Sequence, residues 1–526
     1  MPSQDIFSYP SIGAKWIPFE WGWDVLTYSI FSTGGFIAIS IFRTILICGI
    51  FFILFLAVKK FKIPENIFLI FAVILSLGIL TRFSIRPHLI SYLFFALIVL
   101  IFIEHRYFHS GKKTYYYLLP IIFLLWANMH MGVITGIGLF TLFVLIDGYD
   151  LIKKKDEGKK SKFKLLSIVY IISIWAMLIN PHFIETYTYV LSHSQMNMLE
   201  QINEWKSPFS SASVPASAYN LKIYFFFLFS GLVIVYYSIK RKDYFPSIIY
   251  LLLAIYSAQG NRFITDFLIL SFPFYLLGVN ELLISFKKVK LYTENIIFTS
   301  VTGLIILFFI FSIINGKLYK DYLGTTFRET GFGESEKFFP AQAVDFIKRE
   351  GIDKTGEKIF NNLRCGGYFI WNLPGKQNFI DSRNLSDSIY TWYKWIDLKR
   401  RGFEDKLDYY GIDYILYSTP YLTINVSEIE RNIVSYLCAN SDKWKLVFWD
   451  DKSFLFVKNV SKFKDVIDKF DFKYISPYSF LYNFNKLKES YKNNKTEVDK
   501  EIIRKLEEEP NGIFINDIAN KLRRGL

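Results

Sequence analysis

Two arginines spaced four residues apart could hold an anion. Arg82 and Arg86 lie in a polar interruption between two apolar stretches, and Pro87 follows at the expected first turn of the second stretch. Cations at a helix N-terminus oppose the helix dipole, and an anion held by the guanidinium groups and the free amides of that turn would remove the conflict. Arg262 precedes a later apolar stretch. The three arginines predict a phosphate site; the alternative is that each one anchors a lipid headgroup.

Three carboxylates could take up a proton. Asp5 and Glu20 lie in an aromatic-rich segment ahead of the first long apolar stretch, and Glu204 is followed by Trp205 in the longest polar interruption. A carboxylate against an apolar wall has a raised pKa and can act as a general base. We predict Asp5 and Glu20 as catalytic residues and Glu204 and Trp205 as substrate-binding residues. Alternatively, Glu-Trp pairs anchor the membrane interface and Asp5 caps a turn.

Histidine and asparagine side chains occur in the same set of interruptions. The ones that we predict to bind substrate are His88, Asn128, His130, His182 and Asn261. Imidazole and carboxylate groups suit several divalent ions, but no typical metal-ligand spacing is present. We predict no metal site and leave the identity of any cofactor, a divalent ion included, open. The alternative is that these side chains satisfy backbone groups at helix ends.

Ten apolar stretches must position these residues. They cover roughly residues 35–58, 64–81, 87–103, 115–128, 131–149, 164–180, 220–239, 244–258, 262–285 and 295–314. Several are shorter than the roughly 20 residues that cross a bilayer core, as expected for helices that end beneath a recessed cavity. With 52% hydrophobic and 19% aromatic residues, the chain is predicted to be a polytopic α-helical membrane protein with about ten transmembrane helices.

Basic residues occupy every second interruption. They are Lys59, Lys60 and Lys62; Arg106, Lys112 and Lys113; seven lysines from Lys153 to Lys164; Lys240, Arg241 and Lys242; and Lys287, Lys288 and Lys290. By the positive-inside rule these loops face the cytoplasm. The candidate residues lie in the other interruptions, which are predicted to be outside the cell membrane together with the C-terminal domain.

The net charge of +14 would suggest a nucleic-acid partner in a soluble protein. Much of the surplus lies in the short basic loops, where it orients helices and meets anionic lipid. We therefore predict membrane lipid as a partner and no nucleic acid.

Residues beyond 315 are predicted to form a soluble α/β domain. We expect a helix over 341–350 and short strands over 358–361, 368–372, 377–381, 414–417, 446–449 and 454–457. Turns are expected at Gly366-Gly367, Pro374-Gly375 and Asp450-Asp451-Lys452. The predicted domains are an outer loop over 1–33, a helical domain over 34–314, the α/β domain over 315–460 and a helical extension over 461–526.

Short motifs along nearly the whole chain share a family likeness. They are the segments 5–23, 82–88, 126–130, 179–182, 202–205, 261–263, 360–361, 366–368 and 381–383. Together they resemble uncharacterised bacterial membrane proteins grouped with the GT-C glycosyltransferases. That superfamily includes protein O-mannosyltransferases, lipid A aminoarabinose transferases and the catalytic subunits of oligosaccharyltransferase.

The resemblance implies an activity as well as a fold. GT-C enzymes take a sugar from a polyprenyl phosphate or pyrophosphate at the outer face, and an acidic residue in their first outer loop acts as a base or positions the acceptor. Asp5 matches that residue. The family also has a transmembrane helix ahead of this loop, and we expect the present sequence to lack it. The alternative is that the short amphipathic start is translocated by itself.

Three classes of function fit these patterns. The leading one is an integral-membrane glycosyltransferase that moves a sugar from a polyprenyl-phosphate donor to an extracytoplasmic glycan, lipid or protein. A transporter would be marked by internal repeats and by ionisable groups near the membrane midplane, where only Arg43 is expected. A noncatalytic scaffold in envelope assembly would leave the outer charged residues scattered.

Overall fold

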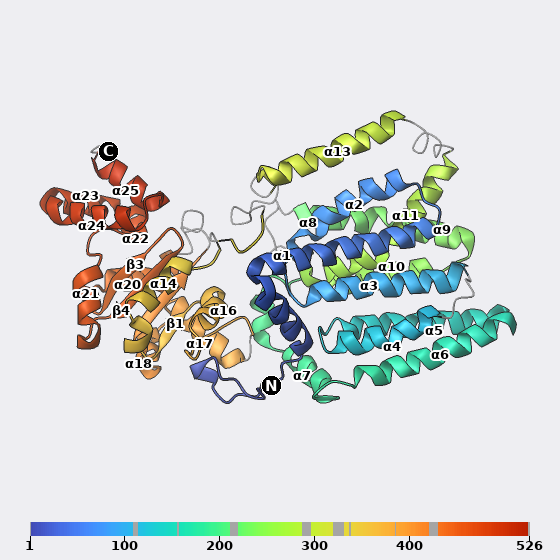
Figure 1. Ribbon diagram of the computed structural model, residues 1–526, viewed down its shortest axis with the longest axis horizontal. Coiled ribbons are helices and arrows are strands. Elements are labelled where there is room, and N and C mark those ends of the chain that lie inside the picture. The colour runs from blue at the N-terminus through green and yellow to red at the C-terminus, as the bar shows by residue number, and fades with distance from the viewer. Residues whose placement is uncertain are drawn as a thin grey trace. The chain divides into compact units, whose positions relative to one another are not determined.

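The computed structural model divides the chain into two compact units (Figure 1). It describes residues 2–108, 114–154, 157–210, 219–286, 296–318, 331–335, 338–383, 386–419 and 430–523. The helical unit comprises Ile17–Glu334, and the C-terminal unit comprises Met1–Trp16 together with Ser335–Leu526. Six of the predicted basic loop residues lie outside the described ranges: Lys112, Lys113, Lys155, Lys287, Lys288 and Lys290.

Apolar helices that run back and forth form the helical unit. They are α1 (Trp21–Lys60), α2 (Glu65–Ile79), α3 (His88–Ile103), α4 (Thr114–Ala127), α5 (Val133–Lys154), α6 (Glu157–Met177), α8 (Tyr219–Ser230), α9 (Leu232–Arg241), α10 (Phe245–Ala258), α11 (Ile264–Ser285) and α13 (Ile296–Ile314). Each predicted apolar stretch coincides with one of them, α8 and α9 together making one stretch. Six segments in the described part of the chain are long and apolar enough to cross a membrane. The prediction of a multi-pass helical membrane protein is confirmed.

Two helices occupy the centre of this unit. Most residues of α3 and α11 are buried, whereas the other long helices bury a smaller share of theirs. Helices α3 and α11 contact each other, and α1 packs on both (Figure 1). A helix that is apolar all round is expected either in a buried position or where it spans a membrane. Helices α3 and α11 occupy the buried positions of this unit.

Helix α1 begins earlier than the sequence suggested. Residues 1–33 were expected to form a loop, but the structure is helical from Trp21, with a break at Gly34 and Gly35, where Gly35 has a φ of 60°. The polar residues of 21–33 are compatible with a helix because their hydroxyl groups bond back to the backbone. Thr27 Oγ1 donates to the Trp23 carbonyl at 2.9 Å, for example.

The C-terminal unit contains a four-stranded mixed sheet in the order β1-β2-β4-β3. Strand β1 (Ile359–Asn361) pairs in parallel with β2 (Tyr414–Ser418), and β4 (Ser453–Lys458) pairs antiparallel with both β2 and β3 (Trp444–Trp449). The helices of this part are α14 (Ala341–Arg349), α15 (Ile352–Thr355), α16 (Leu363–Asn372), α17 (Asp387–Asp397), α18 (Phe403–Tyr409), α20 (Ile433–Ala439) and α21 (Lys464–Phe470). The predicted α/β class is confirmed.

Two of the six predicted strands are absent from the described part of this unit. Residues 368–372 belong to helix α16, and 377–381 contribute a single bridge between Asn378 and Ser8. The buried residues Cys365 and Phe369 are four apart, which is a helical period. Gly366 and Gly367 were therefore wrongly predicted to form a turn between strands, since both lie inside α16.

The two glycines of α16 should respond in opposite ways to alanine. A Cβ atom on Gly366 would lie 2.1 Å from the Ile380 carbonyl oxygen, whereas one on Gly367 would meet none of the described atoms within 4 Å. We expect Gly366→Ala to lower the free energy of unfolding by roughly 1–3 kcal/mol through overpacking. Gly367→Ala should raise it by up to about 1 kcal/mol, because alanine favours the helix. Thermal unfolding of the full chain measures both, and equal effects would contradict the close packing.

Four helices follow the sheet: α22 (Pro477–Tyr482), α23 (Phe484–Asn493), α24 (Lys495–Glu508) and α25 (Ile513–Arg523). Helix α24 is hydrogen-bonded to the end of α21 and to the segment that follows it, residues 469–475. The Glu501 carboxylate accepts hydrogen bonds from the backbone N–H groups of Lys473, Tyr474 and Ile475, and Arg504 donates to the carbonyls of residues 469–471. The helical extension is thus bonded to the α/β domain.

Candidate functional site

Polar side chains of the helical unit gather at one end of the bundle. Helices α1, α3, α5 and α11 begin at this end, and α2, α4 and α10 finish there. Because consecutive helices run in opposite directions, every second interruption of the sequence reaches the same end. Residues more than 200 positions apart can therefore meet in one site.

Glu20 and His130 face each other at the start of α1. Glu20 Oε1 lies 3.9 Å from His130 Nε2. His130 Nδ1 accepts a hydrogen bond from the Gly132 backbone N–H at 3.0 Å and lies 2.7 Å from Ser91 Oγ. Trp126 Nε1, which can only donate, bonds to the same hydroxyl oxygen at 2.6 Å, so the hydroxyl hydrogen turns toward His130. Neutral His130 therefore carries its proton on Nε2, the nitrogen that faces Glu20.

The environment of this pair disfavours charge on both groups. Burial raises the pKa of the Glu20 carboxyl group to about 8, and the neighbouring Asp24 adds to the rise while Arg262 and Arg86 oppose it. Burial also holds the pKa of His130 well below its ordinary value, reinforced by nearby cationic groups. A carboxyl group that changes charge near pH 8 can exchange a proton with a substrate under mildly basic conditions.

Two arginines hold the Glu204 carboxylate. Arg82 Nη1 lies 3.1 Å from Glu204 Oε2, and Arg86 Nη1 lies 3.5 Å from Oε1. Burial alone would raise the pKa of Glu204, but Arg82 and Arg86 outweigh it and hold that pKa below its ordinary value. The Arg86 side chain is 61% exposed. The two guanidinium groups thus already bind one anionic group and leave part of their surface open to another.

Arg262 is joined to the same segment. Its guanidinium group lies over the Trp205 ring, 4.1 Å from the centroid, and its backbone N–H donates to the Glu204 carbonyl at 2.9 Å. Asn261 Nδ2 donates to the Asn203 carbonyl at 2.9 Å. These contacts fix the segment 203–205 against the short turn over Asn261–Phe263 that precedes α11, so Arg262 and Trp205 lie beside the Glu204 group.

His88 and Asn128 brace the helix ends around the site. His88 Nε2 lies 2.9 Å from the Arg82 carbonyl oxygen. Asn128 Oδ1 accepts a hydrogen bond from Trp21 Nε1 at 2.9 Å, and its Nδ2 donates to the Ile179 carbonyl at 2.9 Å. Asn128 thereby ties the end of α4 to the start of α1 and to the segment after α6.

His182 takes part in a local turn. Its backbone N–H donates to Asn180 Oδ1 at 3.0 Å, and Thr186 Oγ1 donates to the same oxygen at 2.8 Å. Within the described residues, no hydrogen bond or ion pair joins the His182 side chain to the groups around Glu20 or Arg82. The structure places His182 next to these loops without bringing it into the cluster.

Asp5 belongs to the C-terminal unit and is fully buried there. Its Oδ1 accepts from Arg383 Nη1 at 2.8 Å, and its Oδ2 accepts from Ser11 Oγ at 2.7 Å. Arg383 also binds Asp381 at 2.6 Å and lies over the Phe7 ring at 4.8 Å. Asp5 and Glu20, predicted together, are therefore placed in different units, and partners of its own unit engage both Asp5 oxygens.

No group of three or more His, Cys, Asp or Glu residues that could hold a metal ion occurs within the described ranges. The Glu20 and His130 pair supplies two potential ligands, and the charged groups that act on Glu20 are Asp24, Arg262 and Arg86.

Sequence reasoning missed several residues of this end of the bundle. Tyr256 OH donates to Asp266 Oδ2 at 3.3 Å and lies 3.1 Å from Thr135 Oγ1. Asp266 lies in the first turn of α11, four positions after Arg262, and the two charged groups interact electrostatically. An acidic residue inside an apolar span is a signal that could have identified it. Ser91 could not be identified in this way, because a single serine in an apolar span has the same sequence pattern as other small residues that pack in a core.

The opposite end of the bundle carries ion pairs of another kind. Arg106 Nη2 lies 2.9 Å from Asp150 and 2.7 Å from Asp243, and His105 Nε2 lies 3.1 Å from Asp147. Arg106 was predicted only as part of a basic loop. Its two acidic partners come from α5 and from the turn between α9 and α10, so these ion pairs join neighbouring helices.

No family model matches this chain, and no curated protein matches it. A solved structure with a similar course of the chain is the archaeal oligosaccharyltransferase AglB from Archaeoglobus fulgidus, in complex with an inhibitory peptide and a dolichol-phosphate. The match has a TM-score of 0.43 and 12% sequence identity, and covers 84% of this chain and 66% of that one. The present chain thus spans just under two thirds of that protein's length.

Proposed function

We propose that the protein is an integral-membrane glycosyltransferase that moves a sugar from a polyprenyl-phosphate donor to a hydroxyl group on an extracytoplasmic acceptor. The observation that carries the proposal is the pair Arg82 and Arg86, which hold an anionic group at the same end of the bundle as the carboxyl group of Glu20. The Glu20 carboxylate can accept a proton, and the Arg82 and Arg86 guanidinium groups can stabilise a leaving phosphate.

The proposed reaction uses these groups in one displacement. Glu20 takes the proton of the acceptor hydroxyl, and the oxygen attacks the anomeric carbon of the sugar. The bond from that carbon to the phosphate oxygen breaks, and the phosphate leaves with the electron pair. Arg82, Arg86 and Arg262 balance the negative charge that develops on it. His130 Nε2–H faces Glu20 and stabilises its charged form.

Trp205 and the helix-end residues would position the substrates. The Trp205 ring, covered on one side by Arg262, can present an apolar surface beside the phosphate site. His88, Asn128 and Asn261 hold the loops that carry the reacting groups. We assign Asp5 to the attachment of the N-terminal segment to the C-terminal unit, since its oxygens bind Arg383 and Ser11.

The orientation follows from the charge distribution. The loops at the opposite end are rich in lysine and arginine, so we place them in the cytoplasm. We place the Glu20 end of the bundle and the C-terminal unit on the extracytoplasmic side. A donor whose lipid lies in the outer leaflet would then reach the site with its phosphate at the level of the arginines.

A panel of labelled donors tests the proposal. The full-length protein in lipid nanodiscs should release polyprenyl phosphate from a polyprenyl-phosphate sugar and transfer the label to an acceptor, but should leave nucleotide sugars intact. If no donor in the panel is consumed, or if nucleotide sugars serve equally well, the proposal is wrong. A transporter would instead accumulate its substrate unchanged in sealed vesicles.

A further inference from the structure

The C-terminal unit has an open pocket on its surface that the proposed reaction does not use, and we call it the cavity. Its volume is about 370 Å³, within the range of small-molecule sites. Strand β3, the end of α20, the segment 471–476 and helices α22 and α23 line it. All of these elements belong to the C-terminal unit, so no residue of the membrane helices lines the cavity.

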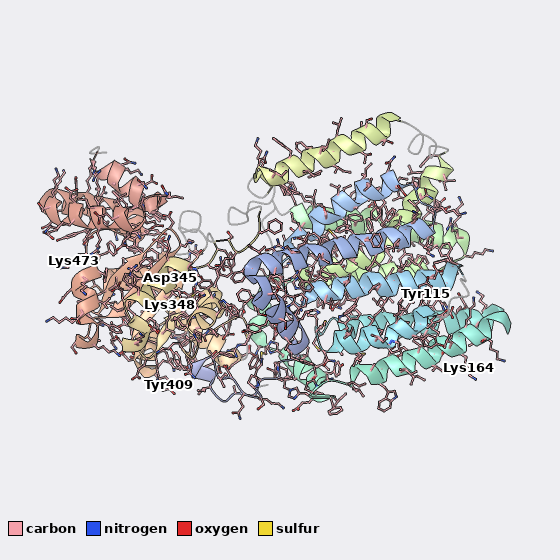
Figure 2. All side chains as sticks on the ribbon, viewed as in Figure 1. Tyr115, Lys164, Asp345, Lys348, Tyr409 and Lys473 are labelled. Carbon is pink, nitrogen blue, oxygen red and sulfur yellow. The ribbon has the colours of Figure 1, made fainter. Side chains whose placement is uncertain are left out.

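Three lysines and one aspartate line this cavity: Lys445, Lys473, Lys486 and Asp471. Lys445 Nζ lies 3.6 Å from Asp471 Oδ2, which neutralises that pair. Lys486 is exposed and has no hydrogen bond or ion pair among the described residues. Lys473, labelled in Figure 2 next to the helical tail, is exposed as well. The cavity therefore has a surplus of positive charge available to an anion.

The remaining lining combines aromatic rings with hydroxyl and amide groups. Trp444, Phe472, Tyr474 and Tyr478 contribute the rings. Trp444 and Phe472 are buried and Arg504 lies over the Phe472 ring, so the partly exposed rings of Tyr474 and Tyr478 supply the accessible aromatic surface. Ser441, Asn483 and Ser490 contribute polar side chains, and none of the described side-chain contacts engages these three. Aromatic surfaces next to small polar groups suit a ligand that has apolar C–H faces and hydroxyl groups at its edge.

The wall over 471–476 is held in place from outside the cavity. Glu501 binds the backbone N–H groups of residues 473–475, and Arg504 binds the carbonyls of residues 469–471. Glu501 is 8% exposed. A ligand would thus meet a preorganised wall, and little ordering of the backbone would accompany binding.

We propose that this cavity binds an anionic saccharide, meaning a sugar that bears a carboxylate or a phosphate group. Lys473 and Lys486 bind the anionic group, and the rings of Tyr474 and Tyr478 pack on the sugar. An alkyl chain would leave the lysines without partners, and a bare phosphate would leave the aromatic rings without a role. The site stands on the geometry of the C-terminal unit alone and does not require glycosyl transfer.

Calorimetric titration of the full-length protein in nanodiscs tests this site. The probes are a glucuronate disaccharide, its neutral methyl ester and inorganic phosphate. We expect the acidic disaccharide to bind at least about tenfold more tightly than the ester, because charge-assisted hydrogen bonds to lysine are lost in the ester. The affinity should fall as salt concentration rises.

Two variants and one control complete the test. Combining Lys473→Ala with Lys486→Ala should weaken binding at least about tenfold and abolish the preference for the acid, whereas Lys492→Ala, on the exposed surface of α23 away from the lining, should change nothing. Glu20→Gln should bind the disaccharide normally, which separates this site from the proposed catalytic one. Equal binding of acid and ester, an unaffected double variant, or phosphate binding as tight as the saccharide would each overturn the proposal.

Discussion

Replacing Glu20 by glutamine is expected to lower kcat by about 100-fold or more, the range typical for loss of a general base. The amide cannot take the proton of the acceptor hydroxyl, while its size and its distance from His130 stay similar. In the native protein kcat/KM should rise with pH and level off above about pH 8, because the charged carboxylate is the active form and its pKa is about 8. Transfer rates measured from pH 6 to pH 10 give both results.

The neighbouring Asp24 provides a second readout of the same group. Its charge contributes to the raised pKa of Glu20, so Asp24→Asn should move the rise in activity to lower pH. Glu200→Gln, at an exposed carboxylate in the loop that contains Glu204, is the matched control and should leave the profile unchanged. A rate that falls as pH rises through 8 would contradict the role of Glu20 as a base.

The positions of the transmembrane helices could be predicted because long apolar runs report directly on membrane burial. Basic and basic-poor polar segments alternate between the apolar stretches, and this alternation predicted which segments lie at the same end of the bundle. This is why the sequence alone could place Glu20, His130, Arg82, Glu204 and Arg262 at one level. Their chemical roles stay predictions.

Other features depend on contacts that local sequence does not encode. The sequence places Asp5 in the same loop as Glu20. Its pairing with Arg383, 378 positions away, and the bridge between Ser8 and Asn378 join this segment to the C-terminal unit. Helix α16 was mistaken for a strand and a turn because Gly366 and Gly367 resemble a turn. Gly366 is there for close packing against Ile380.

Substitution of Arg82 and Arg86 is expected to have a second large effect on turnover. Combining Arg82→Ala with Arg86→Ala is expected to lower kcat by about 100-fold to 1,000-fold, because negative charge develops on the leaving phosphate and preorganised cations stabilise it most in the transition state. The KM for the donor should change less than kcat. Single-turnover measurements with a labelled polyprenyl-phosphate sugar separate the two quantities.

A structural role for the arginines makes a different prediction, and Glu204→Gln distinguishes the two. That variant removes the charge that Arg82 and Arg86 bind in the free protein and leaves both guanidinium groups in place. If the arginines only hold Glu204, both changes break the same ion pairs and should cost the same activity. If they bind the donor phosphate, Glu204→Gln frees them for that phosphate and should retain most of the turnover that the double arginine variant loses.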